Sequence, residues 1–359
     1  MLTDSLQTYL QIQDYTKAIY CLTQNNPGPG NLRHHYLLQL GYCYFMNDEE
    51  KNSKSAYLEA YQGHPNDLQA NLYLGIIFQK LKNYDSALYY YKNLTVIQPD
   101  QYKYWFYASS MFNALREDDS AFLYIQKAYA LRPTAPDVLL RYSAALTQHK
   151  QKDKAVTLID DFLKTNPANE EVIARKITYS AQDAKYGEVI LWGERLLKDS
   201  AEQPTAYTHL AYAYLNNNQI DKCLALYDWM DLQHMKNEMV TYCAAMCYSK
   251  KKDYSKSNLL LDECLSQNLI ATAVTYFRSK ADNYESAKDY KKALSLYDTA
   301  YYIFHNPLDL YYKGRVYDVY LKNQAQASVL YKKYIAAKQK PESIVEQKLF
   351  NYIKEYIKP

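Results

Sequence analysis

Four prolines recur along the chain at a constant interval of 34 residues, at Pro65, Pro99, Pro133 and Pro167. Small residues recur at two other fixed places within the same interval. They are Gly41, Gly75, Ser109 and Ser143, each 24 residues before a proline, and Ser53, Ala87, Ala121 and Ala155, each 12 residues before one. Self-similarity at a fixed period of about 20–50 residues is typical of repeat architectures. The interval therefore predicts one array of repeats instead of the two or so globular domains that a length of 359 residues suggests.

The interval continues on both sides of the prolines. Tyr15 and Ala18 mark an earlier copy, and later copies keep the same places with Tyr186, Tyr254 and Tyr290, with Ala211, Ala245, Ala281 and Gly314, and with Ala293. Ala327 rejoins the series after a slip of one residue. These landmarks predict about ten units over residues 1–340.

Each interval predicts two helices joined by a short polar turn. In the unit DLQANLYLGIIFQKLKNYDSALYYYKNLTVIQPD, apolar and small residues between Leu68 and Gln79 recur at spacings of three and four. The turn KNYD follows, and a second amphipathic run extends from Ser86 to Ile97. Because a residue before proline disfavours helical geometry, this run is predicted to end near Ile97 or Gln98. The small residues are predicted at helix crossings, since helices about 8–10 Å apart leave no room there for a large side chain.

This unit resembles the tetratricopeptide repeat, which favours Trp, Leu-Gly and Tyr in its first helix and Tyr-Asp-x-Ala, a tyrosine pair and a final Pro in its second. The residues that match are Leu40, Gly41, Leu74, Gly75 and Trp105 for the first helix, and Tyr84, Asp85, Ala87, Tyr90, Tyr91, Leu94 and Pro99 for the second. The resemblance implies an all-α fold, an α-solenoid superhelix over residues 1–340. It also implies a C-terminal capping helix at residues 341–359, whose apolar face is predicted to be Val345, Leu349, Tyr352, Ile353 and Tyr356.

Two regions depart from the pattern. The fifth full unit departs from the family pattern at Lys176-Ile177, Val189 and Gly193, and an insertion lengthens the spacing before ATAVTYF. A kink or a changed stacking angle is expected in both regions.

Three consecutive tyrosines, Tyr89 to Tyr91, raise the question of an aromatic binding site. By the family pattern Tyr91 packs between helices and Tyr90 is also a pattern residue, so only Tyr89 is surplus. The cluster is therefore interpreted as structural.

The resemblance implies that first helices line a concave surface with four side chains each. The candidate peptide-binding residues are Tyr42, Phe45, Ile76, Gln79, Lys103, Phe106, Asn113, Tyr212, Tyr242, Arg278, Tyr311 and Arg315. Two alternatives stay open. Tight winding would bury this lining, and Arg278 with Asp282, four residues on, would only support its own helix. Leu38, Leu72 and Phe106 occupy the place where some relatives clamp a C-terminal carboxylate, so that mode is disfavoured.

Composition argues against several classes of protein. The 42 basic and 39 acidic residues give a net charge of +3, without the basic footprint of a nucleic-acid binder. No apolar run approaches the roughly 18 residues of a membrane span. The first residues lack the pattern of a secretory signal, so a cytoplasmic location is expected, or a periplasmic one if a leader was removed. The six cysteines show no disulfide-scaffold spacing and are expected to be packed thiols rather than zinc ligands.

No catalytic motif, phosphate loop or metal-ligand spacing stands out, and SKKK at Ser249 to Lys252 lies in a predicted turn. The expectation is a non-catalytic scaffold without cofactor that binds a peptide segment or a partner subunit, with self-association left open. The alternatives are an RNA-binding helical-repeat protein, which near-neutral charge and apolar Leu38, Leu72, Phe106 and Leu140 disfavour, and an accessory subunit of a separately encoded enzyme.

Overall fold

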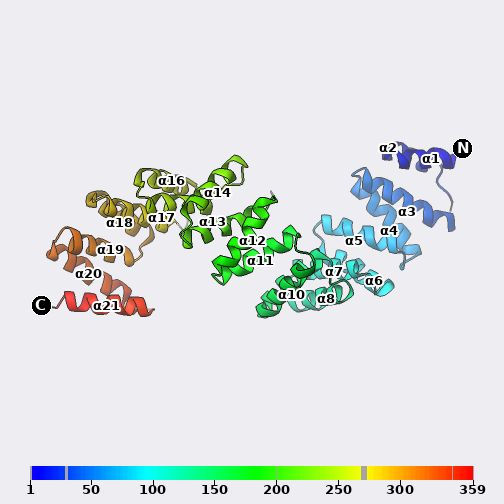
Figure 1. Cartoon of the computed structure of the whole chain (residues 1–359). Coiled ribbons are helices and arrows are strands. Elements are labelled where there is room, and N and C mark those ends of the chain that lie inside the picture. The colour runs from blue at the N-terminus through cyan, green and yellow to red at the C-terminus, as the bar shows by residue number, and fades with distance from the viewer. Residues whose placement is uncertain (1, 29–30, 200, 268–272, 342, 359) are drawn as a thin grey trace. The chain divides into compact units, whose positions relative to one another are not determined.

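The computed structural model describes residues 2–28, 31–199, 201–267, 273–341 and 343–358. Within these ranges the chain forms helices α1 to α21 and one π-helical segment, and no strand. The helices divide into two compact units, residues 1–172 and residues 173–359 (Figure 1). The predicted all-α solenoid is confirmed, and each unit is described separately below.

The first unit consists of five helix pairs in which each helix packs against the next. The helices are α1 (Leu2–Gln11), α2 (Tyr15–Gln24), α3 (Asn31–Met46), α4 (Glu50–Gly63), α5 (Leu68–Lys80), α6 (Tyr84–Ile97), α7 (Tyr102–Ala114), α8 (Asp118–Leu131), α9 (Pro136–Gln148) and α10 (Lys152–Thr165). Helix α6 ends at Ile97, two residues before Pro99, as the proline predicts.

The second unit begins inside α11 and continues the alternation of first and second helices. Its helices are α11 (Glu170–Gln182), α12 (Tyr186–Lys198), α13 (Pro204–Asn216), α14 (Ile220–Leu232), α15 (Glu238–Lys250), α16 (Tyr254–Gln267), α17 (Ala273–Ser286), α18 (Tyr290–Phe304), α19 (Leu308–Arg315), η1 (Val316–Tyr320), α20 (Gln324–Lys338) and α21 (Ile344–Tyr356). First helices also pack on each other, as α13 does on α15 and α15 on α17. The predicted insertion before ATAVTYF falls on residues 268–272 and the start of that stretch, which lie outside the described residues.

A three-residue turn joins the two helices of every pair from α1–α2 to η1–α20. Its middle residue has a left-handed backbone, and these residues are Gln13, Asp48, Lys82, Arg116, Lys150, Ala184, Asn218, Lys252, Lys288 and Lys322. After α5, the N–H of Asn83 donates to the carbonyl of Phe78 at 2.9 Å and closes the helix end. The Asn83 side chain then accepts from the N–H of Ser86 and caps α6. One residue thus ends the first helix and starts the second.

The recurring small residues lie where the helices of a pair cross. A Cβ added to Gly75 would lie 2.5 Å from a ring carbon of Tyr91, and one added to Gly41 would lie 2.9 Å from a ring carbon of Tyr57. In the Ser109 unit the hydroxyl instead donates to the carbonyl of Ala121 across the crossing, at 2.9 Å. The prediction that small side chains allow close helix packing is confirmed.

The fifth full unit reverses the sizes at this crossing. Ile177, which is fully buried, stands on α11 where other units have a small residue, and Gly193 stands on α12 where they have a large one. A Cβ on Gly193 would approach the side chain of Leu210 on α13 to 2.9 Å. In this unit the large residue is thus on the first helix and the glycine on the second, and the glycine is crowded by Leu210 of the next pair. The kink or altered angle predicted here stays a prediction.

The one-residue slip before Ala327 is a π-helical turn. In nine turns the closing N–H donates to a carbonyl five residues earlier, as Asn83 does to Phe78, but Asn323 donates to Tyr317, six residues earlier, at 2.8 Å. The extra residue is absorbed in η1, where Leu321 bonds back to Val316. Where π-helix occurs in proteins, it is mostly a single turn of this kind within an α-helix.

The tyrosine cluster behaves as predicted. Tyr91 is 1% exposed and Tyr90 is 8% exposed, whereas Tyr89 is 53% exposed. The Tyr89 hydroxyl lies 2.9 Å from that of Tyr61 on α4. Two of the three rings are core residues, and the surplus tyrosine lies on the surface.

The last helix, α21, matches its predicted orientation only in part. Phe350 and Ile353 are the residues buried against α20, together with Tyr331 and Tyr334. Val345, predicted on the buried face, is 76% exposed, and Tyr352 is 48% exposed. Ile353 was on the predicted face, and Leu349 and Tyr356 from that face also pack against this cluster. The prediction is therefore confirmed for these three residues and wrong for Val345 and Tyr352.

Five cysteines are fully buried, namely Cys43, Cys223, Cys243, Cys247 and Cys264, and Cys21 is half-buried. The Cys223 thiol points to the carbonyl of Ala211 at 3.4 Å, at the small-residue crossing of its pair. Among the described residues no helix is both long and apolar enough to cross a bilayer.

Candidate functional site

The predicted groove residues of the first unit lie on three successive first helices. Tyr42 and Phe45 on α3 are half-buried, with ring centroids 5.9 and 5.0 Å from that of Tyr73 on α5. The aromatic lining at this end is therefore partly used in packing between pairs. This matches the alternative in which winding covers it.

Further along the first unit the side chains are more accessible. Ile76 is half-buried, while Gln79 is exposed and accepts a hydrogen bond from the Tyr91 hydroxyl at 2.9 Å. On α7, Lys103 is exposed and Asn113 is half-buried. Phe106 lies under the guanidinium of Arg141, 4.7 Å from the ring centroid. The phenyl ring is thus already covered on one face by a cation.

In the second unit, two predicted tyrosines are separate from the remaining three residues. Tyr212 is 42% exposed and meets the ring of Tyr186 edge-on at 6.0 Å. Tyr242 is half-buried, 5.3 Å from the ring of Tyr276, and its burial raises the pKa of its hydroxyl. Neither lies beside the C-terminal cavity described below.

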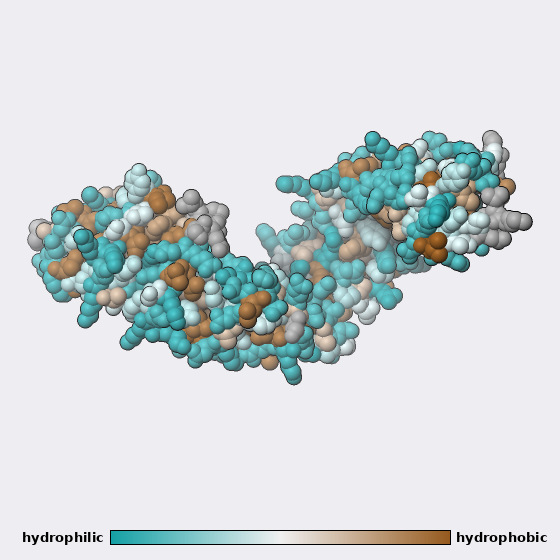
Figure 2. All heavy atoms as spheres, turned by 90° about the horizontal axis from the view of Figure 1, so that it is seen from above, coloured by the Kyte–Doolittle hydropathy of each residue, from teal (hydrophilic) through white to brown (hydrophobic). Residues whose placement is uncertain are grey.

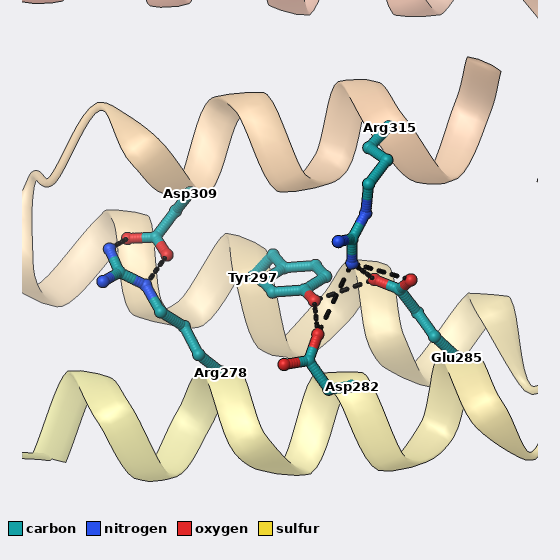
Figure 3. Close-up of polar contacts among 6 residues, drawn as sticks. All are labelled: Arg278, Asp282, Glu285, Tyr297, Asp309 and Arg315. Atoms are coloured by element: carbon teal, nitrogen blue, oxygen red, sulfur yellow. Dashed lines mark hydrogen bonds and ion pairs between the residues drawn. The ribbon is translucent and has the colours of Figure 1, made fainter. Parts of the chain in front are cut away.

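The predicted arginines form ion pairs between neighbouring helix pairs (Figure 3). Arg278 on α17 grips Asp309 on α19 with two hydrogen bonds, of 2.6 and 3.0 Å, and Asp309 is completely buried. The alternative pairing of Arg278 with Asp282 on its own helix is wrong. The carboxylate of Asp309 is buried, so the guanidinium of Arg278 must stay paired with it. This bidentate pair holds α17 to α19.

A second group of charges surrounds Arg315. One terminal nitrogen of Arg315 lies 2.8 Å from both oxygens of Glu285 and 3.4 Å from Asp282. Tyr297 on α18 donates to the same two carboxylates, at 2.8 and 2.7 Å. Burial, the largest single effect, works against the charged guanidinium, but the hydrogen bond to Glu285 together with the charges of Glu285, Tyr297 and Asp282 more than offsets it and raises the pKa of Arg315. Figure 3 shows both groups, from α17, α18 and α19.

Tyr312 lies between the two arginines. The guanidinium carbon of Arg278 is 5.6 Å and that of Arg315 is 5.3 Å from its ring centroid. The ring also stacks on Tyr297 at 5.4 Å. Both positive charges are therefore balanced by carboxylates and covered by an aromatic face, so neither is available as a strong anion site.

The remaining predicted residues, Tyr311 and Arg315, line a cavity of about 590 Å³ between α19, α20 and α21. Its walls are mostly apolar or aromatic, and besides these two they include Leu308, Tyr312, Tyr331, Leu349 and Tyr352. Charged groups are few, namely Arg315, Glu346 and Lys348. A concave, largely apolar site with a few polar groups is typical of ligand-binding pockets.

The π-turn helps to build this cavity. It presents Asp318, which accepts hydrogen bonds from Tyr331 on α20 at 3.3 Å and from Tyr352 on α21 at 2.7 Å. Burial, and the hydrogen bond to Asp318, raise the pKa of Tyr352 to about 12. One carboxylate thus fixes two aromatic walls of the site.

Sequence reasoning identified Tyr311 and Arg315 but placed Val345, Leu349 and Tyr352 in a buried capping face. Spacings of four and three residues put these three on one stripe of α21, while Phe350 and Ile353 form a neighbouring stripe. Ile353 was predicted on the buried face and Phe350 was not, so the presence of a second stripe was the signal that part of the named face, at Val345 and Tyr352, would stay open.

The paired helices, left-handed turns and crossing residues define a solenoid of helix–turn–helix repeats. The fold resembles a tetratricopeptide repeat protein from Parabacteroides merdae ATCC 43184, with a TM-score of 0.50, 12% sequence identity, and coverage of 68% of this chain and 97% of that one. Residues 182–264 also match the family described as anaphase-promoting complex (cyclosome) subunit 3. The chain therefore has the fold of tetratricopeptide repeat proteins.

Two other structures are more distant. MamA from Desulfovibrio magneticus RS-1 has a TM-score of 0.41 at 14% identity, over 47% of this chain and 94% of that one. The human IFIT1 dimer with m7Gppp-AAAA has a TM-score of 0.47 at 12% identity, over 96% of this chain and 85% of that one. Likenesses this low support no inference about function. No protein with curated function matches the sequence.

Proposed function

We propose that this protein is a non-catalytic scaffold that binds an apolar segment of a partner protein in the cavity between α19, α20 and α21. The observation that carries the proposal is the cavity of about 590 Å³ with aromatic walls from three helices. A volume of this size accommodates several side chains of a peptide. Tyrosine rings supply large contact areas with little rotamer entropy to lose, which favours peptide recognition.

The electrostatics of the site favour an uncharged segment. The charge of Arg315 is balanced by Glu285 and Asp282. The charge of Arg278 is balanced by Asp309. To bind either arginine, a phosphate would have to displace Glu285 or Asp309, both buried, at the cost of leaving that carboxylate without a partner. This speaks against the RNA-binding alternative. An accessory subunit of a separately encoded enzyme would use the same surface, and co-purification with an enzyme distinguishes that case.

A peptide selection with one variant and one matched control tests the proposal. Peptides from a displayed random library are enriched on the full chain, and their affinities are then measured for Val345→Asp and Ile344→Asp. Both residues are about 80% exposed in the first turn of α21, but only Val345 lines the cavity. Val345→Asp is expected to weaken binding at least tenfold, because it places a charge against the apolar ligand, and Ile344→Asp to leave it unchanged.

The enriched peptides are expected to share adjacent apolar or aromatic residues without a required charge. Selection of phosphorylated or strongly acidic ligands, or equal losses for both variants, would contradict a neutral apolar site at this position.

A further inference from the structure

The second helices carry a repeating position that is occupied by side chains of very different size. It is the residue seven after the left-handed turn residue, here called the ridge position. It is Tyr89 in α6, Thr157 in α10 and Ala225 in α14. Thr157 lines a cavity of about 400 Å³ in the first unit, and Ala225 lines one of about 480 Å³ in the second. Each unit thus has a cavity beside a short ridge residue.

The large ridge residue Tyr89 shows which group fits beside such a helix. Its ring centroid lies 6.5 Å from that of Tyr61 on α4, and the two hydroxyl oxygens are 2.9 Å apart, a hydrogen-bonding distance. Two repeat intervals later, Tyr129 corresponds to Tyr61 and Thr157 to Tyr89. The chain therefore contains this site twice, once with a phenol ring in it and once without. We call them the filled site and the open site.

The open site keeps the groups that hold the ring in the filled one. Its apolar and aromatic walls, from α8, α9 and α10, are Tyr129, Tyr142, Leu146 and Leu158. The rings of Tyr129 and Tyr142 are stacked, with centroids 4.9 Å apart. The Tyr129 hydroxyl makes no hydrogen bond to any residue in the described part of the chain, although its counterpart, Tyr61, is bonded to Tyr89. A phenol bound here gains ring contacts and a hydrogen bond to that hydroxyl.

The charges around the open site favour a neutral ligand. Asp153 and Lys154 line it side by side, so their opposite charges balance. Burial above all, with the nearby charges of Tyr142 and Asp161, raises the pKa of Tyr129, and its hydroxyl therefore stays neutral and able to donate. The site consequently offers a neutral hydroxyl partner and no net charge for an anionic or cationic group.

The cavity of the second unit lacks this free hydroxyl. Leu197 takes the place of Tyr129 there. The hydroxyl that lines the cavity, that of Tyr214, already donates to Glu194 at 3.0 Å, and Lys222 donates to the same carboxylate oxygen at 2.7 Å. Its polar groups are paired with each other, so the cavity of the first unit is the one that matches the filled site.

The size of the open site favours a single inserted side chain. On the face drawn in Figure 2, hydrophobic residues, in brown, form small patches separated by hydrophilic surface. Surfaces of this kind lack the contiguous apolar area, larger than a few hundred Å², that marks a broad interface. In the filled site Tyr89 stays 53% exposed, so the site encloses about half of a ring and leaves the rest of the ligand in solvent. A side chain attached to a polypeptide meets this condition.

We propose that the open site beside Thr157 binds a tyrosine side chain of a partner polypeptide, with the ligand hydroxyl bonded to that of Tyr129. The site is separate from the C-terminal cavity and does not depend on binding there. Because half of the ring stays exposed, a single tyrosine without its polypeptide should bind with a roughly millimolar dissociation constant.

Methyl NMR of the full chain tests this with N-acetyltyrosine amide as the probe. The methyl signals of Leu146 and Leu158, which line the open site, are expected to shift and to saturate. N-Acetylphenylalanine amide lacks the hydroxyl and is expected to bind about threefold to tenfold more weakly, the worth of one neutral hydrogen bond. The methyl signals of Leu349 report separately on binding in the C-terminal cavity.

Two variants test the geometry. Tyr129→Phe is expected to lower the affinity for the tyrosine amide to that for the phenylalanine amide. The matched control is Tyr61→Phe, which makes the same change in the filled site and should leave both affinities unchanged. Thr157→Tyr is expected to fill the open site from within, as Tyr89 fills its own, and to abolish binding. Thermal unfolding of each variant checks that the fold is retained.

Several results would overturn the proposal. Absence of a saturable shift at tens of millimolar would show that the open site takes no tyrosine. Equal affinities for the two amides in the wild type, or unchanged binding to Thr157→Tyr, would remove the likeness to the filled site. Saturation by p-cresol but not by the tyrosine amide would exclude a side chain attached to a polypeptide.

Discussion

Single residues set how closely the helices of a pair approach. At Gly75 the ring of Tyr91 lies against the Cα atom. At the crossings of Ser109 and Cys223 the side chain instead donates a hydrogen bond to a carbonyl of the facing helix. Sequence spacing identified these places because the requirement for small size recurs with the repeat. Sequence spacing did not identify the ion-pair partner of Arg278. Asp282 and Asp309 are both within reach of its side chain, and only the packing of the helices decides between them.

Gly75→Ala tests the crossing directly. The added methyl would overlap a fully buried ring, and overpacking of this kind costs about 1–3 kcal/mol, against a gain of about 1 kcal/mol in helix propensity. Because an approach of 2.5 Å is far inside ordinary contact, the upper part of this cost applies, about 2–3 kcal/mol. We therefore expect a net loss of about 1–2 kcal/mol, seen as a lower midpoint of thermal unfolding. Gly187→Ala on α12 is the control, because nothing lies within 4 Å of its added Cβ, and it should be neutral or stabilising. A Gly75→Ala protein as stable as the wild type would contradict the close approach.

At the scale of the element, the turns are more regular than the helices they join. Ten turns share one left-handed residue, although none of these residues is glycine. The second-helix ends were predictable from the prolines, as at Ile97. The π-turn was not, because the slip between Gly314 and Ala327 fits an extra residue in the first helix, in the turn or in the second helix equally well. Only the hydrogen bond from Asn323 to Tyr317 places it.

Ala184→Gly tests the strain in these turns. A left-handed alanine costs about 1–2 kcal/mol relative to right-handed backbone, and glycine removes most of this while adding roughly 0.5–1 kcal/mol of chain entropy. We expect a gain of about 0.5–1 kcal/mol, measured as a higher unfolding midpoint. Ala181→Gly, inside α11, is the control and should lose about as much. A loss in both variants would show that the turn is not strained.

At the scale of the whole molecule, each unit is held together by contacts between neighbouring repeats. The repeat pattern therefore predicts the fold well but the function poorly. The predicted groove residues share one register, yet only Tyr311 and Arg315 line the C-terminal cavity. The cavity depends on how α21 packs, and the sequence of that helix does not follow the repeat pattern. Its two apolar stripes left the choice of buried face to tertiary packing.

The 42 tyrosines should limit the stability of the folded chain at alkaline pH. Burial raises the pKa of Tyr57, Tyr91, Tyr297 and Tyr331, and burial with neighbouring hydrogen bonds raises those of Tyr61 and Tyr352 to about 12. The unfolded chain releases these protons near pH 10, where the folded state still holds them. The free energy of unfolding should therefore be constant with respect to these groups below about pH 10 and fall between about 10 and 12. Circular dichroism and tyrosinate absorbance should change together, and full ionisation without unfolding would contradict this.

Six of the ten left-handed turn residues are lysine or arginine, namely Lys82, Arg116, Lys150, Lys252, Lys288 and Lys322. A protease such as trypsin needs an extended backbone at its cleavage site, so these bonds are protected for as long as the adjoining pair stays folded. When a pair opens, its own turn becomes a substrate. Brief digestion should consequently release fragments that end at these six residues, which are about one repeat apart from Lys82 to Lys150 and again from Lys252 to Lys322. The earliest bands would report which pair opens first.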